Sequence, residues 1–134
     1  MRVMLDTNII VSAGVFGGAW TSNLTLRIAD EHSLVLSSVV IEELREVVAQ
    51  KFPSKASVLE QFLKRLSYEI AYTPIEIDED IYPEVRDKND YPILASAIIA
   101  DVDVFITNDK DFDPIDIDRP EILTLLLFQQ KYLF

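Results

Sequence analysis

Four of the twenty-three acidic residues in this sequence stand beside apolar stretches, where an ordinary surface acid is not expected. Asp6 directly follows the β-type run 2–5, and Asp109 lies just beyond a second such run, 103–107. In open α/β sheets, the carboxyl ends of the strands line the ligand-binding crevice. We therefore expect both aspartates at the edge of a sheet where a ligand can bind.

Glu43 is the third of these acids, and it borders the apolar stripe of a predicted helix. It lies three residues after Val40 and four before Val47, whereas Glu42 and Glu46 project further round the helix. Glu43 is therefore the acid of this helix that could point inward. A glutamate that extends its carboxylate from the edge of the stripe into solvent is an equally good interpretation.

Asp90 is the fourth acid, and it lies three residues before Ile93 at the start of another predicted helix. An aspartate before Tyr-Pro is also a good N-cap, and a first-turn carboxylate can serve both as a cap and as a ligand. Asp87 is near enough to contribute but less well placed. Asp6 and Asp109 have simpler interpretations too, as a turn residue and as a member of an acid-rich loop.

Carboxylates that converge on one site repel each other. A pair at about 4 Å costs roughly 1 kcal/mol in water and up to about 4 kcal/mol at an effective dielectric of 20. A metal-free cluster would be strongly destabilised or partly protonated, and a divalent cation removes this conflict. Oxygen ligands suit Mg²⁺ or Mn²⁺. Such an ion can activate water and stabilise charge on a phosphoryl oxygen, which is the chemistry of phosphodiester hydrolysis.

The elements that must position these acids alternate short β-type runs with amphipathic stretches. This pattern predicts an α/β fold, with a mostly parallel central sheet of about four to five strands flanked by helices. Thr21 or Ser22 is the expected N-cap of the first helix and Ser37 or Ser38 that of the second, which Pro53 ends. Strands are predicted at 2–5, 34–36, 70–72, 103–107 and 121–123, and helices at 21–31, 38–51, 54–68, 90–100 and from 124.

Length and composition limit the classes of protein that this sequence can belong to. Its 134 residues, 49% of them hydrophobic, predict one folded domain over 1–134. The absence of cysteine excludes disulfides and thiol catalysis, and the single histidine, His32, excludes a catalytic triad or a histidine-rich metal site. No apolar run is long enough for a membrane span, and Asp6 interrupts the N-terminal run too early for a signal peptide. We therefore expect a cytoplasmic protein without a membrane segment.

The net charge of −11 argues against nucleic-acid binding, because affinity for phosphates depends on basic patches. The argument weakens if several acids bind a cation, or if basic residues cluster locally. Five basic residues do fall on two consecutive predicted helices, and they could form a rim for RNA or an ordinary solvated surface. These residues are Arg45, Lys51, Lys55, Lys64 and Arg65.

Two apolar segments have no obvious role in the acidic site. The loop 16–20 carries Phe16 and Trp20 around two glycines, and it could contact a substrate or partner, or Trp20 could anchor the core. The C-terminal residues 125–128 and 132–134 are unusually apolar for a chain end. We expect them to pack into the core or to form an interface.

The blocks around the acids resemble those of PIN-domain proteins, in particular the toxin components of bacterial and archaeal toxin–antitoxin pairs of the VapC-like kind. The resemblance covers nearly the whole chain, and its specificity lies in the order and spacing of the blocks. They are Leu5-Asp6-Thr7-Asn8, Glu42-Glu43-Leu44, Asp87-Lys88-Asn89-Asp90 and Thr107-Asn108-Asp109-Lys110-Asp111-Phe112. Many family members carry glycine where Asn108 stands, and asparagine tolerates the same left-handed turn geometry.

The resemblance implies Mg²⁺- or Mn²⁺-dependent endonucleolytic cleavage of RNA, with one or two ions bound. It implies that a paired antitoxin blocks the site and that the protein forms a homodimer. The implied metal-binding acids are Asp6, Glu43, Asp90 and Asp109. Asn8 and Thr107 are implied as supporting polar groups and Asp111 as an additional ligand, and Asp87 lies close enough to assist.

Two other functional classes remain open from the sequence. One is a non-catalytic PIN-like module that binds a protein partner, which the net charge and the apolar C-terminus favour; titration with Mn²⁺ separates it from a nuclease. The other is a phosphoryl-transfer regulator, such as a receiver domain or a haloacid-dehalogenase-like phosphatase. The phosphatase requires a second aspartate two residues after the first, and this chain has Asn8 there.

Overall fold

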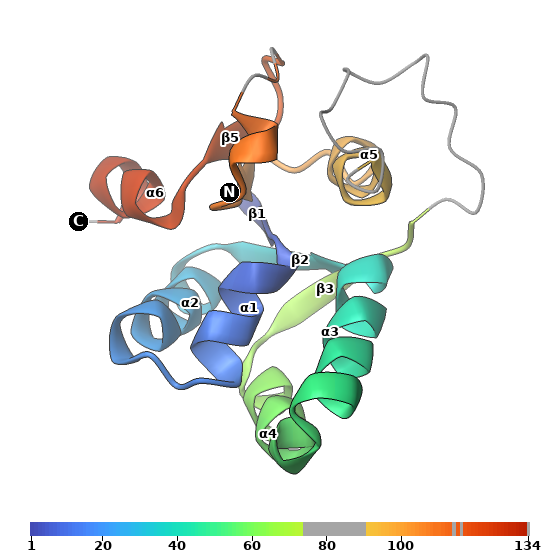
Figure 1. Cartoon of the computed structure of the whole chain (residues 1–134). Helices are drawn as coiled ribbons and strands as arrows, with labels where there is room; N and C mark the ends of the chain where they lie inside the picture. Colours follow the sequence, from blue (N-terminus) through green and yellow to red (C-terminus); the bar gives the residue numbers. More distant parts are fainter. Residues whose placement is uncertain (74–90, 114, 116, 134) are drawn as a thin grey trace.

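Five strands form the central sheet in the order β3-β2-β1-β4-β5, and each neighbouring pair is parallel (Figure 1). The computed structural model describes residues 1–73, 91–113, 115 and 117–133. The predicted α/β fold with a parallel sheet is confirmed. The strands are β1 (Arg2–Leu5), β2 (Ser33–Ser37), β3 (Tyr68–Ala71), β4 (Val104–Ile106) and β5 (Glu121–Leu123).

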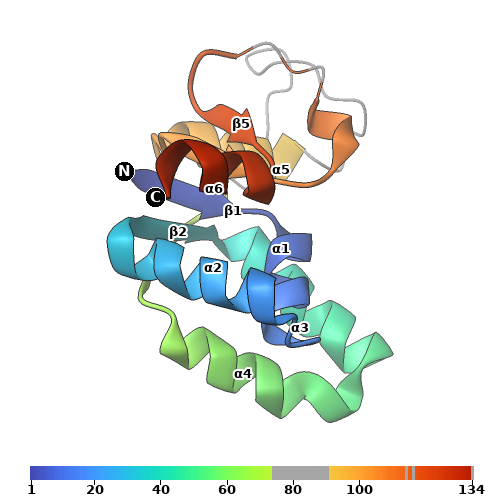
Figure 2. The same cartoon turned by 90° about the vertical axis from the view of Figure 1, so that its left-hand side faces the viewer.

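Helices cover both faces of this sheet. In Figures 1 and 2, α2 and α6 lie on one side, α3 and α5 lie on the other, and α4 lies at the bottom of the molecule. The α-helices are α1 (Thr7–Gly14), α2 (Ala19–Glu31), α3 (Ser38–Lys51), α4 (Ala56–Arg65), α5 (Tyr91–Ile99) and α6 (Leu125–Tyr132). Two short 3-10 helices, η1 (Pro53–Lys55) and η4 (Lys110–Phe112), follow α3 and β4.

The inner strands β1 and β4 are apolar on both faces. Val3, Met4 and Leu5 of β1 are fully buried, as are Phe105 and Ile106 of β4. Helices on both sides of a parallel sheet leave its inner strands no solvent-exposed face, so continuous apolar runs are expected there. The candidate acids Asp6 and Asp109 follow the carboxyl ends of these buried strands.

The helix α1 was not predicted, although Asp6 directly precedes it. With eight residues, this helix is too short to be stable through helix propensity alone. Its β-branched residues also have low helix propensity. Burial of Ile9, Ile10 and Ala13 against the rest of the protein stabilises it instead. Asp6 is consequently both a strand-end residue and the N-cap of a helix.

Three other predicted helix starts can be compared with the structure. Ser37 caps α3 by accepting a hydrogen bond from the Val40 N–H at 3.1 Å, as predicted, and Thr124 caps α6. The predicted caps of α2 are wrong, because that helix begins earlier, after Gly18, without a side-chain cap. Trp20 lies in its first turn and is 49% exposed, so it does not anchor the core.

No single helix among the described residues has the length and apolar character needed to cross a bilayer. The helices α1 and α2 meet those criteria only as a pair, and they are bent by 115° where they join.

Gly14 allows α1 and α4 to approach closely, which gives a prediction about stability. A β-carbon at this position would lie 2.5 Å from Cδ1 of the Phe62 ring, which is itself 5% exposed. Gly14→Ala should therefore lower the free energy of unfolding by about 1–3 kcal/mol, the usual cost of overpacking a core. Urea denaturation measures this change.

The smaller side chain in Phe62→Leu provides the control. Gly14→Ala should cost less in the Phe62→Leu background than in the wild type, because residues in contact have non-additive effects. Equal costs in both backgrounds would exclude this contact as the cause.

Candidate metal centre

Asp6 stands at the carboxyl edge of the sheet because β1 ends immediately before it. Leu5 pairs with Ile106 of β4, so the next residues of the two strands, Asp6 and Thr107, lie side by side. The Asp6 Oδ1 accepts a hydrogen bond from the Thr7 N–H at 2.7 Å, and its Oδ2 accepts one from the Thr107 hydroxyl at 2.7 Å. Both oxygens of this carboxylate are held in place from opposite sides.

Thr107 connects the two strand-end aspartates. Its hydroxyl donates to Asp6 and accepts a hydrogen bond from the Asp109 N–H at 3.0 Å. The Asp109 carboxylate in turn accepts from the Asp111 N–H at 2.9 Å, which caps η4. Thr107 is only 3% exposed, so this arrangement is shielded from competing water. The sheet edge therefore positions Asp6 and Asp109 through one buried hydroxyl.

Glu43 reaches the same region from α3. Its Oε2 accepts a hydrogen bond from the hydroxyl of Thr7, at 3.0 Å. Glu43 is exposed, and so are Glu42 and Glu46, but only Glu43 of the three lines the cavity that contains Asp6. This position agrees with the expectation that, of these three glutamates, Glu43 faces the site.

The pKa of Asp6 is raised, and burial of the carboxylate is the largest cause. The negative charges of Asp109 and Glu43 raise this pKa as well, while the hydrogen bonds from Thr107 and the Thr7 backbone oppose the shift. Desolvation and like charges both disfavour the ionised carboxylate. The folded protein therefore places two further acids, Glu43 and Asp109, near the Asp6 carboxylate, whose negative charge it does not by itself fully compensate.

A cavity of about 530 Å³ opens beside these acids. Asp6 after β1, residues of α1, α3 and α5, and the segment after β4 surround it, together with Phe52 at the end of α3. The lining side chains are Asp6, Thr7, Asn8, Val11, Val39, Glu43, Val47, Lys51, Phe52, Ile93 and Asp109.

The chemistry of these side chains fits a hard divalent cation. The candidate ligands among the described residues, Asp6, Glu43 and Asp109, are all carboxylates, which Mg²⁺ and Mn²⁺ prefer, and a cation would relieve the repulsion at Asp6. Within the described ranges, no group of three or more histidine or acidic side chains is gathered tightly enough to hold a metal ion. The expected ligand Asp90 and its neighbour Asp87 lie outside the described residues.

The other predicted site residues take different positions. Asn8 is exposed and lines the cavity, whereas the side chain of Asp111 is not among those that line it. Asn108 accepts a hydrogen bond from the Leu125 N–H at 3.3 Å, which ties the loop after β4 to α6. Thr7 was missed as a functional residue, although its place directly after Asp6 in the same motif was a usable signal.

The three basic residues expected to contact RNA differ in whether they line the cavity and in whether they form an ion pair. Arg45 forms an ion pair with Glu60 at 2.8 Å. Lys51 lines the cavity, and it takes part in none of the ion pairs between described residues. Lys55 lies in η1 and is exposed, outside the cavity lining.

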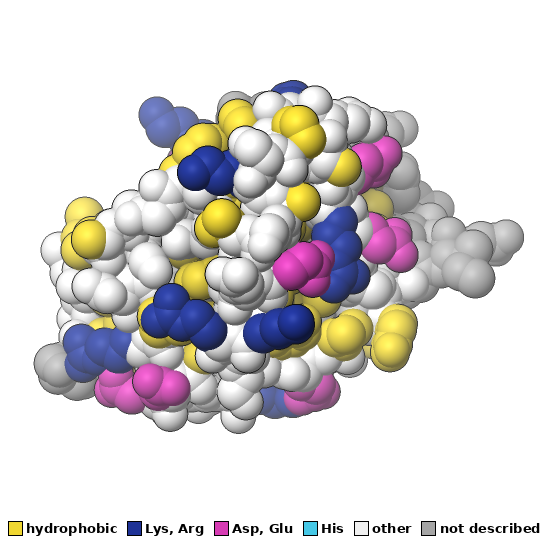
Figure 3. Space-filling model, turned by 90° about the horizontal axis from the view of Figure 1, so that it is seen from below, with side chains coloured by type: hydrophobic (Ala, Val, Ile, Leu, Met, Phe, Trp, Pro, Cys, Tyr) yellow, Lys and Arg dark blue, Asp and Glu magenta, His cyan; other side chains and the backbone are white. Residues whose placement is uncertain are grey.

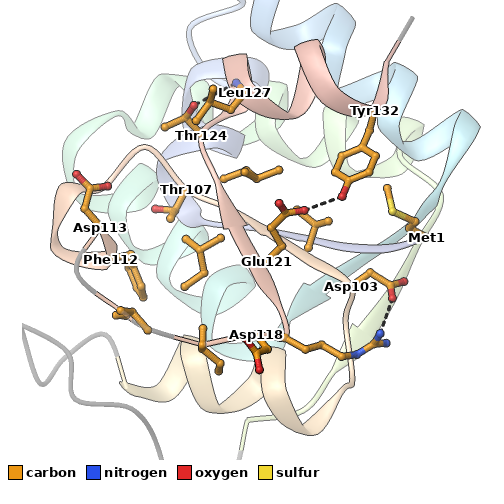
Figure 4. A pocket seen from close by; sticks show the side chains of 16 residues that line it. Met1, Asp103, Thr107, Phe112, Asp113, Asp118, Glu121, Thr124, Leu127 and Tyr132 are labelled. Carbon is orange, nitrogen blue, oxygen red and sulfur yellow. Dashed lines mark hydrogen bonds and ion pairs between the residues drawn. The ribbon is translucent and has the colours of Figure 1, made fainter.

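A larger cavity of about 770 Å³ lies beside β5 (Figure 4). Several of its charged side chains already have partners, since Asp103 pairs with Arg119 at 2.8 Å and Glu121 accepts from the Tyr132 hydroxyl at 2.6 Å. Thr107 lines this cavity while its hydroxyl bonds Asp6. The Thr107 side chain therefore links the two cavities, and the acids Asp6, Glu43 and Asp109 line the smaller one.

The chain matches a family model and solved structures. A family model described as "PIN domain" matches residues 2–111. A chain in the crystal structure of VapBC2 from Rickettsia felis, bound to a DNA fragment from their promoter, is 26% identical to this chain. The alignment covers 92% of this chain and 97% of that chain, with a TM-score of 0.67. No curated protein matches.

Proposed function

The chain belongs to the PIN-domain family and resembles VapC, and on this basis we propose that it is a metal-dependent endoribonuclease that hydrolyses RNA phosphodiester bonds. One observation carries the proposal most strongly. Asp6, Glu43 and Asp109 come from separate parts of the chain and line one cavity. Burial raises the pKa of Asp6. Perturbed acids that converge in a cavity are typical of catalytic sites.

In this proposal Asp6, Glu43 and Asp109, together with Asp90 from outside the described residues, hold one or two Mg²⁺ or Mn²⁺ ions. A bound ion of this type supplies a water molecule of raised acidity and neutralises charge that develops on the phosphoryl group. Asn8, Asp87 and Asp111 are the proposed supporting residues, and Asp87 also lies outside the described residues.

The remaining polar side chains of the site act on the acids. The Thr107 hydroxyl fixes the orientation of the Asp6 carboxylate and the backbone of Asp109. The Thr7 hydroxyl does the same for Glu43. Second-layer hydrogen bonds of this kind fix the geometry of ligands and raise their basicity. In this proposal a strand of RNA enters the cavity that the acids line.

We also propose that the protein is the toxin of a toxin–antitoxin pair. The VapBC2 structure to which it is similar contains DNA from a promoter, which fits a partner that regulates transcription. An antitoxin would then block the cavity, and the toxin itself would form a homodimer acting on cytoplasmic RNA. Because β5 extends the sheet and α6 packs against β5, we assign residues 1–134 to one PIN domain.

Removal of the metal tests the proposed activity. Purified protein should cleave an end-labelled RNA in the presence of Mg²⁺ or Mn²⁺, and EDTA should abolish cleavage until excess metal restores it. Calorimetric titration with Mn²⁺ provides a readout that does not depend on the choice of RNA. No binding at millimolar Mn²⁺ would instead favour a non-catalytic PIN-like module that engages a protein partner.

A further inference from the structure

We propose that the cavity continues along α3 as a binding site for one strand of RNA, with Lys51 contacting a phosphate and the rings of Phe16 and Phe52 stacking against an unpaired base. This inference rests on the proposed ribonuclease function, because it assigns the substrate's path to the same cavity. It identifies a positioning site at the end of the cavity opposite the acids.

One face of α3 provides the floor of this path. Val39, Glu43, Val47 and Lys51 all line the cavity, and they follow one another at intervals of four residues. Residues with this spacing lie in a row along a helix. Glu43 and Lys51 are separated by about 12 Å along the helix axis. This distance exceeds the roughly 3.4 Å rise of a stacked nucleotide, so the row is long enough for more than one nucleotide.

An aromatic pair lies at the Lys51 end of the row. Phe52 ends α3 and lines the cavity, and the ring of Phe16 packs edge-to-face against it with centroids 5.0 Å apart. Phe16 is 59% exposed, so most of this ring faces solvent. Exposed aromatic rings beside a basic groove are the means by which proteins stack the bases of single strands. A base within a duplex is already stacked and cannot use such a surface.

The charge of this end of the molecule suits a phosphate backbone. Residues 45–65 contain five basic and two acidic side chains, a net charge of +3 in a chain whose net charge is −11. Figure 3, which views the α4 end, shows Lys and Arg side chains on this face, with apolar side chains and some Asp and Glu side chains between them. A local basic surface attracts phosphates even where the total charge is negative. The acidic remainder of the chain would repel RNA, so the strand is directed to this face.

The test measures binding separately from cleavage. All variants are made in an Asp6→Asn background, and fluorescence anisotropy reports the affinity for a labelled single-stranded RNA and for a duplex of the same sequence. Lys51→Gln should weaken single-strand binding and reduce the slope of log affinity against log salt by about 0.7, the contribution of one phosphate contact. Phe16→Leu should weaken it by roughly 5- to 100-fold, with little change for the duplex.

Two variants at residues that do not line the cavity serve as matched controls. Lys131→Gln removes a positive charge from α6, and Tyr72→Leu removes an aromatic ring that is 78% exposed. Both should bind RNA as the Asp6→Asn background does. Wild-type-like binding and salt slope in Lys51→Gln and Phe16→Leu would overturn the inference, as would equal losses for duplex and single strand. Because the wild type is assayed for cleavage in parallel, an inactive wild type would instead count against the ribonuclease function.

Discussion

Replacing Asp6 by asparagine should reduce metal-dependent RNA cleavage by at least about 100-fold, the loss typical when one charge-stabilising group is removed from a site. Asparagine has the same shape, and its carbonyl oxygen can still accept the hydrogen bond from the Thr7 N–H. The Thr107 hydroxyl can accept a hydrogen bond from the new amide instead of donating one. The variant therefore loses the negative charge that a cation requires, and little else.

The same variant should be at least as stable as the wild type when no metal is present. A carboxylate with a raised pKa favours the folded state only while it is protonated, so this contribution is present at low pH and is lost as the pH rises through the raised pKa. At neutral pH the ionised Asp6 consequently costs the wild type stability that Asp6→Asn recovers. The difference in free energy of unfolding should shrink as the pH is lowered toward the ordinary pKa of an aspartate.

Urea denaturation at several pH values and a cleavage assay together check this result. Asp30→Asn is the matched control, because it removes one negative charge from an exposed position on α2. It should cleave RNA at the wild-type rate. Cleavage by Asp6→Asn at the wild-type rate would show that Asp6 is not a ligand or catalytic group, and a large loss of stability would show that its main role is structural.

The position of Asp6 and Asp109 was predictable because it depends on chain direction alone. Each follows an apolar strand, and parallel strands bring their carboxyl ends to one edge of a sheet. The position of Glu43 followed from helical periodicity in a similar way. These three predictions needed no knowledge of which distant segments pack together.

The contacts that complete the site depend on packing, and the sequence pattern did not reveal them. Thr7 meets Glu43 across 36 positions of the chain because α1 packs against α3, and α1 itself forms only because its apolar residues are buried. Among the basic residues, Arg45 is partly neutralised by Glu60 on α4, whereas Lys51 faces the cavity. The two cations look equivalent in the sequence, and only the arrangement of the helices distinguishes them.

Thr107→Val should lower cleavage by about 10- to 100-fold, the usual effect of losing a hydrogen bond that orients a metal ligand. Valine fills nearly the same space, but it removes both the donor to Asp6 and the acceptor for the Asp109 N–H. The Asp6 carboxylate would then keep the hydrogen bond from the Thr7 N–H but lose the one that fixes its Oδ2, and the Asp109 backbone would lose its described partner. A buried polar group left unpaired costs about 1–3 kcal/mol, so stability should fall as well.

Thr107→Ser separates the orienting role from a general effect on folding. Serine keeps the hydroxyl and removes only a methyl group, so it should restore most of the activity and of the affinity for Mn²⁺. The decisive comparison is calorimetric Mn²⁺ affinity and kcat/KM for the wild type, Val and Ser proteins, with urea denaturation of each. If Thr107 orients Asp6, the Val variant binds Mn²⁺ more weakly even at temperatures where it is fully folded. If the Val and Ser variants instead lose activity equally, the methyl group matters and the hydroxyl does not position the acids.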